Sequence, residues 1–359
     1  MKKLIFLLIA LILAVRNYAQ DTLVVTLTHG ERISAYYGED GLIEAIDDAA
    51  SGDVINLSGG KFYFPSRVNK AVSIRGNGWR NTELYPYSLK PEHYIGGDCD
   101  FIIDIPSSES NYFKLEGLSI YGQYNNSYDH SSYLCITNAT KTSITHCRVT
   151  SAWVSDSTCT SIVNCYLEYF SASENSKLFL ANCIVNRLNN NRTESTDNFN
   201  AYFTNCYFNT RHSIRPGLID EDNCSNMGNS LFMNCILYYE FQGDDESHNT
   251  LTSSGSLPST SYAENCVALG YKTSPFTVQT NCTTASHEDL FADYSGSIVL
   301  IDEAKTKYLG TDGKEVGVYG GFFPYTLTPS YPLITKISAP LTTTDEGILK
   351  MEVEVSNGQ

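Results

Sequence analysis

A short pattern recurs along the middle of the chain: an apolar residue, any residue, Asn-Cys, any residue, and a second apolar residue. Its clearest copies occupy residues 162–167, 180–185, 203–208 and 232–237. A pattern that returns at a roughly constant interval predicts stacked repeats, in which each unit buries its apolar side chains only against its neighbours. The recurrence therefore constrains the architecture of the chain strongly and its chemistry very little.

Seven of the eleven cysteines occupy the same position of the repeat. They are Cys147, Cys165, Cys183, Cys206, Cys235, Cys266 and Cys282. Their spacings run from 16 to 31 residues. The average, about 22 residues, suits one coil of three short strands, and the longer spacings indicate loops that project between coils. We therefore expect a solenoid of about nine or ten coils.

Asparagine at the turn of each repeat has a conformational reason. A sharp corner places one residue in the left-handed region, which Asn tolerates better than most non-glycine residues. Gly76, Gly117 and His146 occupy the equivalent position in earlier repeats, and we expect the same backbone geometry there. Stacked Asn amides would also hydrogen-bond from coil to coil. The predicted structural ladder consists of Asn164, Cys165, Asn182, Cys183, Asn205, Cys206, Asn234 and Cys235.

Cysteines in register on neighbouring coils would lie about 4.8 Å apart, which is the spacing between strands. Their Cβ atoms would then lie farther apart than the roughly 3.5–4.5 Å of a disulfide. We therefore expect a buried stack of free thiols that behave as small apolar side chains. Cys99, Cys135, Cys159 and Cys224 lie off this position and are better candidates for disulfides.

The start of the chain predicts export. Lys2 and Lys3 precede an apolar run over residues 4–15, which is too short to span a bilayer and has the layout of a secretory signal over residues 1–19. Its removal with Arg16 would take the net charge from −16 to −19. The prediction is a secreted or cell-surface protein, with the periplasm as an alternative, and no integral membrane association. The acidity disfavours nucleic acid as a partner.

The N-terminal region resembles a known family. Residues 41–50 read as an amphipathic helix, followed by Gly52-Asp53 and strand-like segments that end at Gly76. This order resembles the first coils of pectin-lyase-like proteins. The resemblance implies an all-β, single-stranded right-handed parallel β-helix with a short N-terminal capping helix. It would occupy residues 20–323, followed by a linker and a C-terminal β tail over residues 324–359.

Residues 311–321 resemble the terminal coil of secreted β-helix proteins from Bacteroidetes-type bacteria, and alternation near residues 349–355 predicts a strand. Lyases and hydrolases share this fold with proteins that have no catalytic activity, so the resemblance does not select an activity.

A polysaccharide lyase on this fold would need a basic residue close to a carboxylate cluster. The candidate catalytic residues are Arg187, Arg211, His212, Arg215, Asp220 and Asp222. When acidic and basic residues lie next to one another on a surface loop, they more often form an ion-pair network than an active site. A second acidic loop, Asp244, Asp245 and Glu246, offers oxygen ligands for calcium without matching a known calcium loop. No other cofactor is expected.

Tyrosine is abundant, with 25 residues, and several occur at strand positions that would face outward. Such rings can stack on the apolar faces of sugars, although tyrosine is also an ordinary strand-forming residue. The candidate ligand-binding residues are Tyr166, Tyr169, Tyr238 and Tyr239. Further pairs or groups are Tyr36 and Tyr37, Tyr85 and Tyr87, and Tyr121, Tyr124 and Tyr128.

Two functions remain open on these grounds. The first is a non-catalytic secreted β-helix that binds a polysaccharide or cell-surface glycan through an outer face. The alternative is a divergent polysaccharide lyase or glycoside hydrolase acting on an extracellular polysaccharide. A third reading, a purely structural surface protein, predicts no glycan binding.

Overall fold

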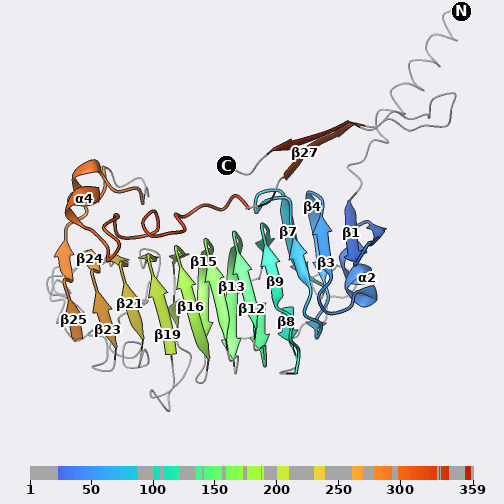
Figure 1. Cartoon of the computed structure of the whole chain (residues 1–359), viewed down its shortest axis with the longest axis horizontal. Helices are drawn as coiled ribbons and strands as arrows, with labels where there is room; N and C mark the ends of the chain where they lie inside the picture. Colours follow the sequence, from blue (N-terminus) through green and yellow to red (C-terminus); the bar gives the residue numbers. More distant parts are fainter. Residues whose placement is uncertain are drawn as a thin grey trace, which may run out of the picture.

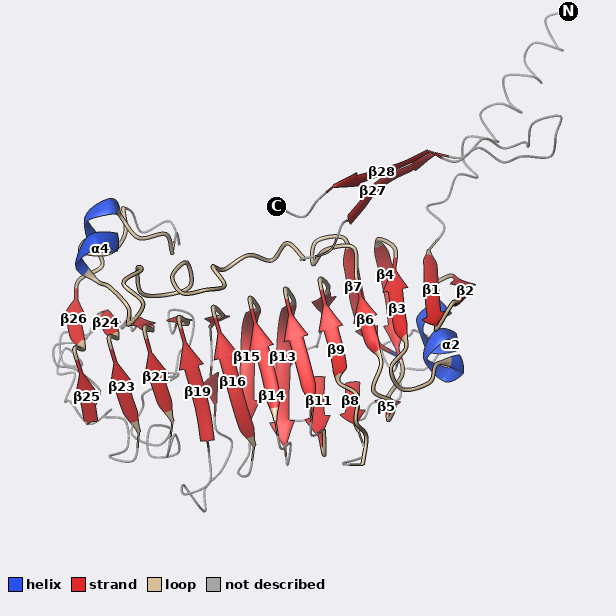
Figure 2. Ribbon diagram, viewed as in Figure 1, coloured by secondary structure: helices blue, strands red, loops and turns tan. Residues whose placement is uncertain are grey.

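The computed structural model describes residues 23–87, 101–105, 108–121, 134–139, 141–155, 159–172, 176–186, 188–189, 200–209, 230–238, 261–269, 276, 278–292, 298–329, 331, 333–338 and 352–356. These residues are mostly strands, arranged in two long sheets (Figures 1 and 2). Within these ranges no helix has both the length and the apolar character needed to cross a membrane.

The first sheet has twelve strands in the order β2-β1-β3-β6-β9-β12-β14-β16-β19-β21-β23-β25. From β3 onward all neighbours are parallel and in register. The strands are β1 (Val24–His29), β2 (Arg32–Tyr37), β3 (Val54–Leu57), β6 (Ser73–Arg75), β9 (Phe113–Glu116), β12 (Thr142–Thr145), β14 (Thr160–Val163), β16 (Lys177–Ala181), β19 (Asn200–Thr204), β21 (Leu231–Met233), β23 (Tyr262–Glu264) and β25 (Val278–Thr280).

The second sheet has fourteen strands, of which ten follow the order β26-β24-β22-β20-β17-β15-β13-β10-β7-β4. These are β4 (Gly60–Phe64), β7 (Thr82–Pro86), β10 (Ser119–Ile120), β13 (Arg148–Ser155), β15 (Tyr166–Ala172), β17 (Ile184–Val185), β20 (Tyr207–Asn209), β22 (Ile236–Tyr238), β24 (Val267–Leu269) and β26 (Thr283–Ala285). The remaining four are β5 (Arg67–Val68), β8 (Phe101–Asp104), β11 (Leu134–Thr137) and β18 (Leu188–Asn189).

The chain alternates between the two sheets, and each coil adds one parallel strand to the first sheet and one or two to the second. This is the stacked-coil arrangement of a β-solenoid, and it confirms the prediction of in-register parallel repeats. The first sheet has ten parallel strands in the described part of the chain, one per coil, in agreement with the nine or ten coils expected from the repeat length.

The corner column is the row of residues that follow the first-sheet strands: Gly117, His146, Asn164, Asn182, Asn205, Asn234, Asn265 and Asn281. All eight have φ between 50° and 65°, which confirms the prediction of left-handed corners. Gly76 is an exception, because its φ lies outside this region. A Cβ atom at Gly76 would lie 2.8 Å from Leu118 Cβ and 2.9 Å from Thr82 Cβ, so close packing explains this glycine.

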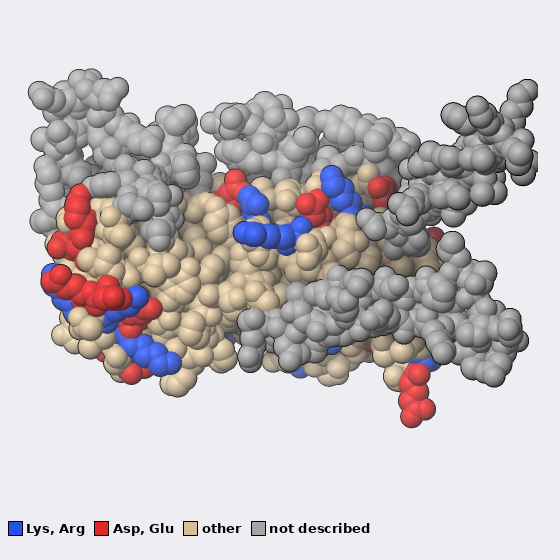
Figure 3. All heavy atoms as spheres, turned by 90° about the horizontal axis from the view of Figure 1, so that it is seen from above, with Lys and Arg blue, Asp and Glu red and all other residues tan. Residues whose placement is uncertain are grey.

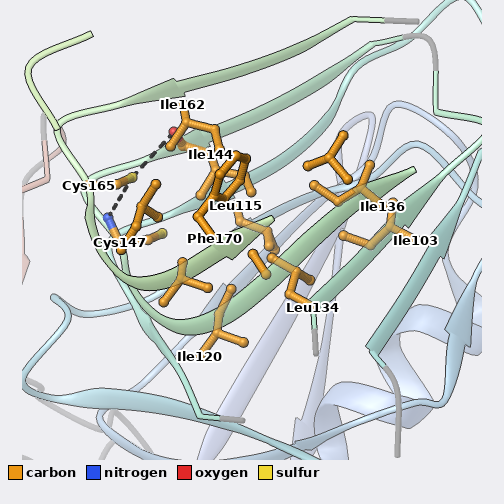
Figure 4. Packing of buried hydrophobic residues seen from close by; sticks show 14 of the residues in the cluster. Ile103, Leu115, Ile120, Leu134, Ile136, Ile144, Cys147, Ile162, Cys165 and Phe170 are labelled. Atoms are coloured by element: carbon orange, nitrogen blue, oxygen red, sulfur yellow. Dashed lines mark hydrogen bonds between the residues drawn. The ribbon is translucent and has the colours of Figure 1, made fainter. Parts of the chain in front are cut away.

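The seven predicted cysteines line the interior beside this column. Six are fully buried, and none of the seven forms a disulfide. Figure 4 shows two of them, Cys147 and Cys165, among the buried apolar side chains. The thiol of Cys165 donates to Val163 O at 3.3 Å and to Ile144 O of the preceding coil at 3.5 Å. Burial raises the pKa of Cys165, which keeps it protonated. The prediction of free, stacked thiols is confirmed for these residues. The off-column Cys159, which the sequence made a candidate for a disulfide, is also a free thiol, so that expectation was wrong for Cys159.

The N-terminal end of the solenoid is covered as predicted, with an addition. Helix α2 (Gly41–Asp48) buries Leu42, Ala45 and Ile46 against the first strands. The sequence did not predict that β1 and β2 would form an antiparallel hairpin, with β1 pairing with β3. Together these elements cover the edge that β3 would otherwise expose.

The outer face of the second sheet is covered over its later coils by residues 286–292 and 298–309, here called the cap segment, which contain helix α4 (Asp302–Lys307). A second apolar cluster fills the space between them, separate from the interior core. The sheet contributes Ile184, Tyr207, Ile236, Tyr238, Val267 and Leu269. The C-terminal region contributes Leu290, Phe291, Leu300, Ala304, Tyr308, Val316 and Val318.

Residues 310–329 with Tyr331, here called the strap, run back along the corner column toward the N-terminal coils (Figure 1). Asn234 Oδ1 accepts from Thr311 N at 2.9 Å, and Asn182 Nδ2 donates to the carbonyls of Val318 and Gly320, both at 2.8 Å. Residues 311–321 therefore form no terminal coil, and that expectation was wrong. The Asn amides bind this returning segment as well as one another, since Asn234 Nδ2 also donates to Asn205 Oδ1 of the preceding coil at 3.5 Å.

The strap ends in a notch at Gly117. The Tyr331 hydroxyl donates to the carbonyls of Gly76 and Glu116, the latter at 3.1 Å. A side chain at Gly117 would clash with Pro329 and with the Tyr331 hydroxyl. Gly117 therefore supplies room for the strap as well as a left-handed corner.

Replacing Gly117 with Asn tests this second role. Asn tolerates the φ of 65°, so overpacking against the strap is the main expected effect, lowering the free energy of unfolding by about 1–3 kcal/mol. Gly30→Asn is the matched control, because Gly30 has φ 56° and nothing within 4 Å of its Cβ position. Chemical denaturation measures both, and equal effects of the two variants would contradict the notch.

Beyond the strap, β27 (Leu333–Ser338) and β28 (Glu352–Ser356) pair with each other as an antiparallel two-stranded sheet. The tail is thus a hairpin with its own pairing, separate from the two long sheets. The strand predicted near residues 349–355 corresponds to β28.

Candidate functional site

On the first coils, the cap segment does not cover the outer face of the second sheet. The side chains on this face form two adjacent columns. The register places Lys61 beside Glu83, and Tyr63 beside Tyr85. Continuing the β7–β10 register places Tyr121 beside Tyr85. These five residues are here called the tyrosine face. They point outward because Phe62, Leu84 and Ile120, which alternate with them, are buried in the core.

Tyr85 lies at the centre of this face and is held on both sides. Its ring stacks on Tyr121 with the centroids 5.1 Å apart and the planes 6° apart. From the preceding coil, Lys61 Nζ lies 5.1 Å from the centroid of the Tyr85 ring. The Tyr85 hydroxyl donates to Glu83 Oε2 at 2.9 Å, and burial together with this carboxylate raises the pKa of Tyr85. Tyr85 is therefore a neutral, fixed ring.

Tyr121 ends the stack. The next position in register is Thr150, whose side chain is too small to continue the aromatic column. Tyr121 therefore stacks on Tyr85 with one face of its ring, and its other face takes no part in the stack. A flat, fixed ring next to smaller side chains is the geometry to which the apolar face of a sugar can stack.

A polar group follows on the next coils. Arg148 Cζ lies 5.6 Å from the centroid of the Tyr166 ring, and Arg148 Nη2 lies 3.7 Å from Glu168 Oε2. The Tyr166 hydroxyl accepts a hydrogen bond from Asn186 Nδ2 at 2.5 Å, and Asn209 Nδ2 donates to Asn186 Oδ1 at 3.4 Å. These side chains extend the outer face with groups that can donate to and accept from hydroxyls.

Several charged side chains of the described residues form ion pairs. Arg75 lies 3.8 Å from Glu116, Arg67 lies 3.2 Å from Asp104, and Arg148 pairs with Glu168. Seen from the side of the strap, basic and acidic side chains of the described residues lie next to one another (Figure 3).

His146 is half-buried at a corner, with Nδ1 3.8 Å from Glu116 Oε1. Burial lowers its pKa, and the Glu116 carboxylate opposes that shift. No group of three or more His, Cys, Asp or Glu residues within the described ranges is arranged to hold a metal ion.

Most sequence-predicted site residues lie outside the described residues. These are Arg187, Arg211, His212, Arg215, Asp220, Asp222, Tyr239, Asp244, Asp245 and Glu246. Of the others, Tyr166 and Tyr169 lie half-buried on β15. Tyr238 is only 6% exposed, because it packs in the second apolar cluster, so its ring is not available to a ligand here.

The structure thus places the exposed aromatic column earlier in the chain than the candidates Tyr166 to Tyr239. Lys61, Tyr63 and Glu83 were missed as site residues. A signal was present, because Lys61-Phe62-Tyr63 and Glu83-Leu84-Tyr85 show the same alternation of charged, apolar and tyrosine residues. Aligning these two segments as neighbouring coils would have placed both tyrosines in one outward column.

No protein-family model matches this chain, and no curated protein matches it.

Proposed function

We propose that this protein is an exported, right-handed parallel β-helix, similar in fold to pectin-lyase-like proteins, that binds a glycan through the tyrosine face. The observation that carries the proposal is the parallel Tyr85–Tyr121 ring pair on an outward strand face, fixed by Lys61 and Glu83. Rigid rings with polar neighbours suit a ligand that combines apolar ring faces with hydroxyl groups.

The contrast along the second sheet supports this location. Over later coils the chain covers its own outward apolar side chains with the cap segment. On the first coils the cap segment is absent, and half-buried tyrosines remain at the surface. A group of surface aromatic rings rimmed by polar residues is typical of an interaction or ligand-binding site.

Replacing Tyr121 with Ala is expected to weaken glycan binding about tenfold, since an aromatic contact of this kind contributes about 1 kcal/mol beyond its buried area. Tyr202→Ala is the matched control, because Tyr202 also lies on an outward strand face and stacks on Phe179, with centroids 5.4 Å apart, but on the first sheet. Isothermal titration calorimetry against ligands selected from a glycan array measures both. Equal affinities of the Tyr121 variant and the parent protein would contradict the site.

The alternative, a lyase or hydrolase, rests on residues outside the described ranges and stays a prediction. It is tested by incubating the purified protein with uronic-acid and neutral polysaccharides, with and without calcium. Unsaturated products detected by absorbance would support the lyase over the binding protein.

A further inference from the structure

The N-terminal hairpin ends the first sheet with an open strand edge. Among the described residues, β2 pairs only with β1, and it lies at the outer end of the row of strands (Figure 2). Its six residues pair with β1 in an unbroken register, without a bulge, and they include no proline. Bulges and prolines are devices by which proteins prevent an edge strand from pairing further. The geometry of β2 is therefore that of a strand that can accept another strand.

Alternate residues of β2 turn their backbone groups toward this edge. Gly38 N donates to Leu23 O at 3.0 Å, so these two residues continue the β1–β2 register as a hydrogen-bonded pair. Because such pairs alternate along an antiparallel ladder, Ser34 and Tyr36 direct their backbone groups toward β1. The residues that direct them away from β1 are Ile33, Ala35 and Tyr37. In the described part of the chain no backbone partner bonds to these outward groups.

The side chains of the same three residues form an apolar stripe beside the edge. Ile33 is 69% exposed, Tyr37 is 63% exposed, and Ala35 between them is also exposed. They share one side of β2 because alternate residues of a strand lie on the same face. An added strand with apolar residues at alternate positions would cover this stripe while it pairs with the open backbone groups.

Carboxylates surround the open edge. Glu31 precedes β2 and Glu39 follows it, and both are exposed. Asp48 of α2 adds a third carboxylate beside the strand, where it accepts from the Tyr36 hydroxyl at 2.8 Å. The eight residue steps from Glu31 to Glu39 span about 27 Å in an extended chain. A strand of about nine residues with a basic residue at each end would meet both glutamates.

A second copy of this chain fits the edge poorly. Only one register of two antiparallel β2 strands uses all three outward residues, and it pairs Ile33 with Tyr37 of the second copy. The same register places Glu31 opposite Glu39 of the second copy, and this happens twice by symmetry. Like charges directly opposite one another destabilise a strand pair. The charges therefore favour a partner of opposite sign over self-association.

We propose that the β2 edge binds an extended, basic segment of another protein by antiparallel strand addition. The backbone groups of Ile33, Ala35 and Tyr37 would supply the hydrogen bonds, and the apolar stripe would supply contacts at alternate positions. Glu31 and Glu39 would select basic residues at the two ends of the segment. This site lies on the first sheet, so it is independent of the glycan site proposed on the tyrosine face.

The test uses a fluorescent nine-residue peptide, Lys-Ser-Val-Thr-Val-Thr-Val-Ser-Lys, titrated with the full-length protein and followed by anisotropy at low salt. The same peptide with Glu in place of both lysines should bind about tenfold more weakly, and the difference should shrink at high salt. N-methylation of the central valine removes the N–H that faces Ala35 and should weaken binding at least about tenfold. The double variant Glu31→Gln with Glu39→Gln should remove the preference for the lysine peptide.

Ala35→Pro tests the strand edge from the protein side. It removes the central outward N–H, leaves the pairing with β1 in place, and should weaken binding of the lysine peptide at least about tenfold. Ala35→Val is the matched control, because it retains the N–H and should bind as the parent protein does. Equal binding of the lysine and glutamate peptides overturns the basic partner. Absence of binding, or binding that survives both N-methylation and Ala35→Pro, overturns the site. Self-association that is lost in Ala35→Pro would assign the edge to a second copy and also overturn the proposal.

Discussion

Replacing Phe232 with Ala is expected to lower the free energy of unfolding by about 3–5 kcal/mol. The ring is fully buried and lies within 4.8 Å of Phe203, 5.9 Å of Phe208 and 6.4 Å of Phe276, measured between centroids. Because these rings come from several coils, the cavity would loosen the contact between coils as well as within one. We therefore expect this single substitution to lower the free energy of unfolding strongly.

Phe322→Ala is the control for that change, since Phe322 lies on the strap and is 82% exposed. Its substitution should change the unfolding free energy by no more than about 0.5 kcal/mol. Urea denaturation followed by circular dichroism measures both variants. Similar losses for the two would show that the aromatic stack is not the core of the solenoid.

Replacing Asn182 with Asp is expected to cost a comparable amount, about 3–5 kcal/mol, for an electrostatic reason. Asn182 is 2% exposed and donates both amide hydrogens to strap carbonyls, those of Val318 and Gly320. A carboxylate of the same shape has no hydrogen to donate and places a buried negative charge against two carbonyl oxygens. The left-handed corner is unaffected, since Asp tolerates it nearly as well as Asn.

Asn281→Asp makes the same change at an exposed corner with φ 53°, to which no hydrogen bond from the strap is made. We expect an effect within about 0.5 kcal/mol there. Thermal unfolding of the two variants against the parent protein separates the roles of the corner and of the strap. If both variants lose equal stability, the strap contributes nothing at Asn182.

The repeat pattern was sufficient to predict the architecture, because its cause is local. A corner needs a residue that tolerates positive φ, and the neighbouring Cys must fit a crowded interior. Asn164-Cys165 and its equivalents meet both needs within two residues. Such requirements recur in every coil and so become visible in the sequence.

The strap could not be predicted in the same way, because its contacts are specific and distant. Val318 and Gly320 bind Asn182 across more than 130 residues, and nothing repeats around them. The glycines between residues 310 and 321 suggested a coil, but Gly310 instead allows a close approach to Asn234. Contact with the strap also explains why the corner column has Gly at position 117, where most other coils have Asn.

The sequence predicted the type of candidate site but not its position on the sheet. An outward tyrosine column was expected, yet its place depended on which coils the cap segment covers. Tyr238 and Tyr85 occupy equivalent outward positions on the second sheet, and only the second apolar cluster distinguishes them. Burial by a segment from the far end of the chain leaves no signal near Tyr238.

Hydrogen–deuterium exchange distinguishes a strap that lies on the corner column from one that does not. Thr311 N donates to Asn234 Oδ1 and Gly317 N donates to Asn234 O, while Tyr325 N donates to Val318 O within the strap. Peptides over residues 310–325 should exchange slowly in the parent protein and quickly in Asn182→Asp, while those over α2 stay protected in both. Fast exchange of residues 310–325 in the parent protein would contradict the account.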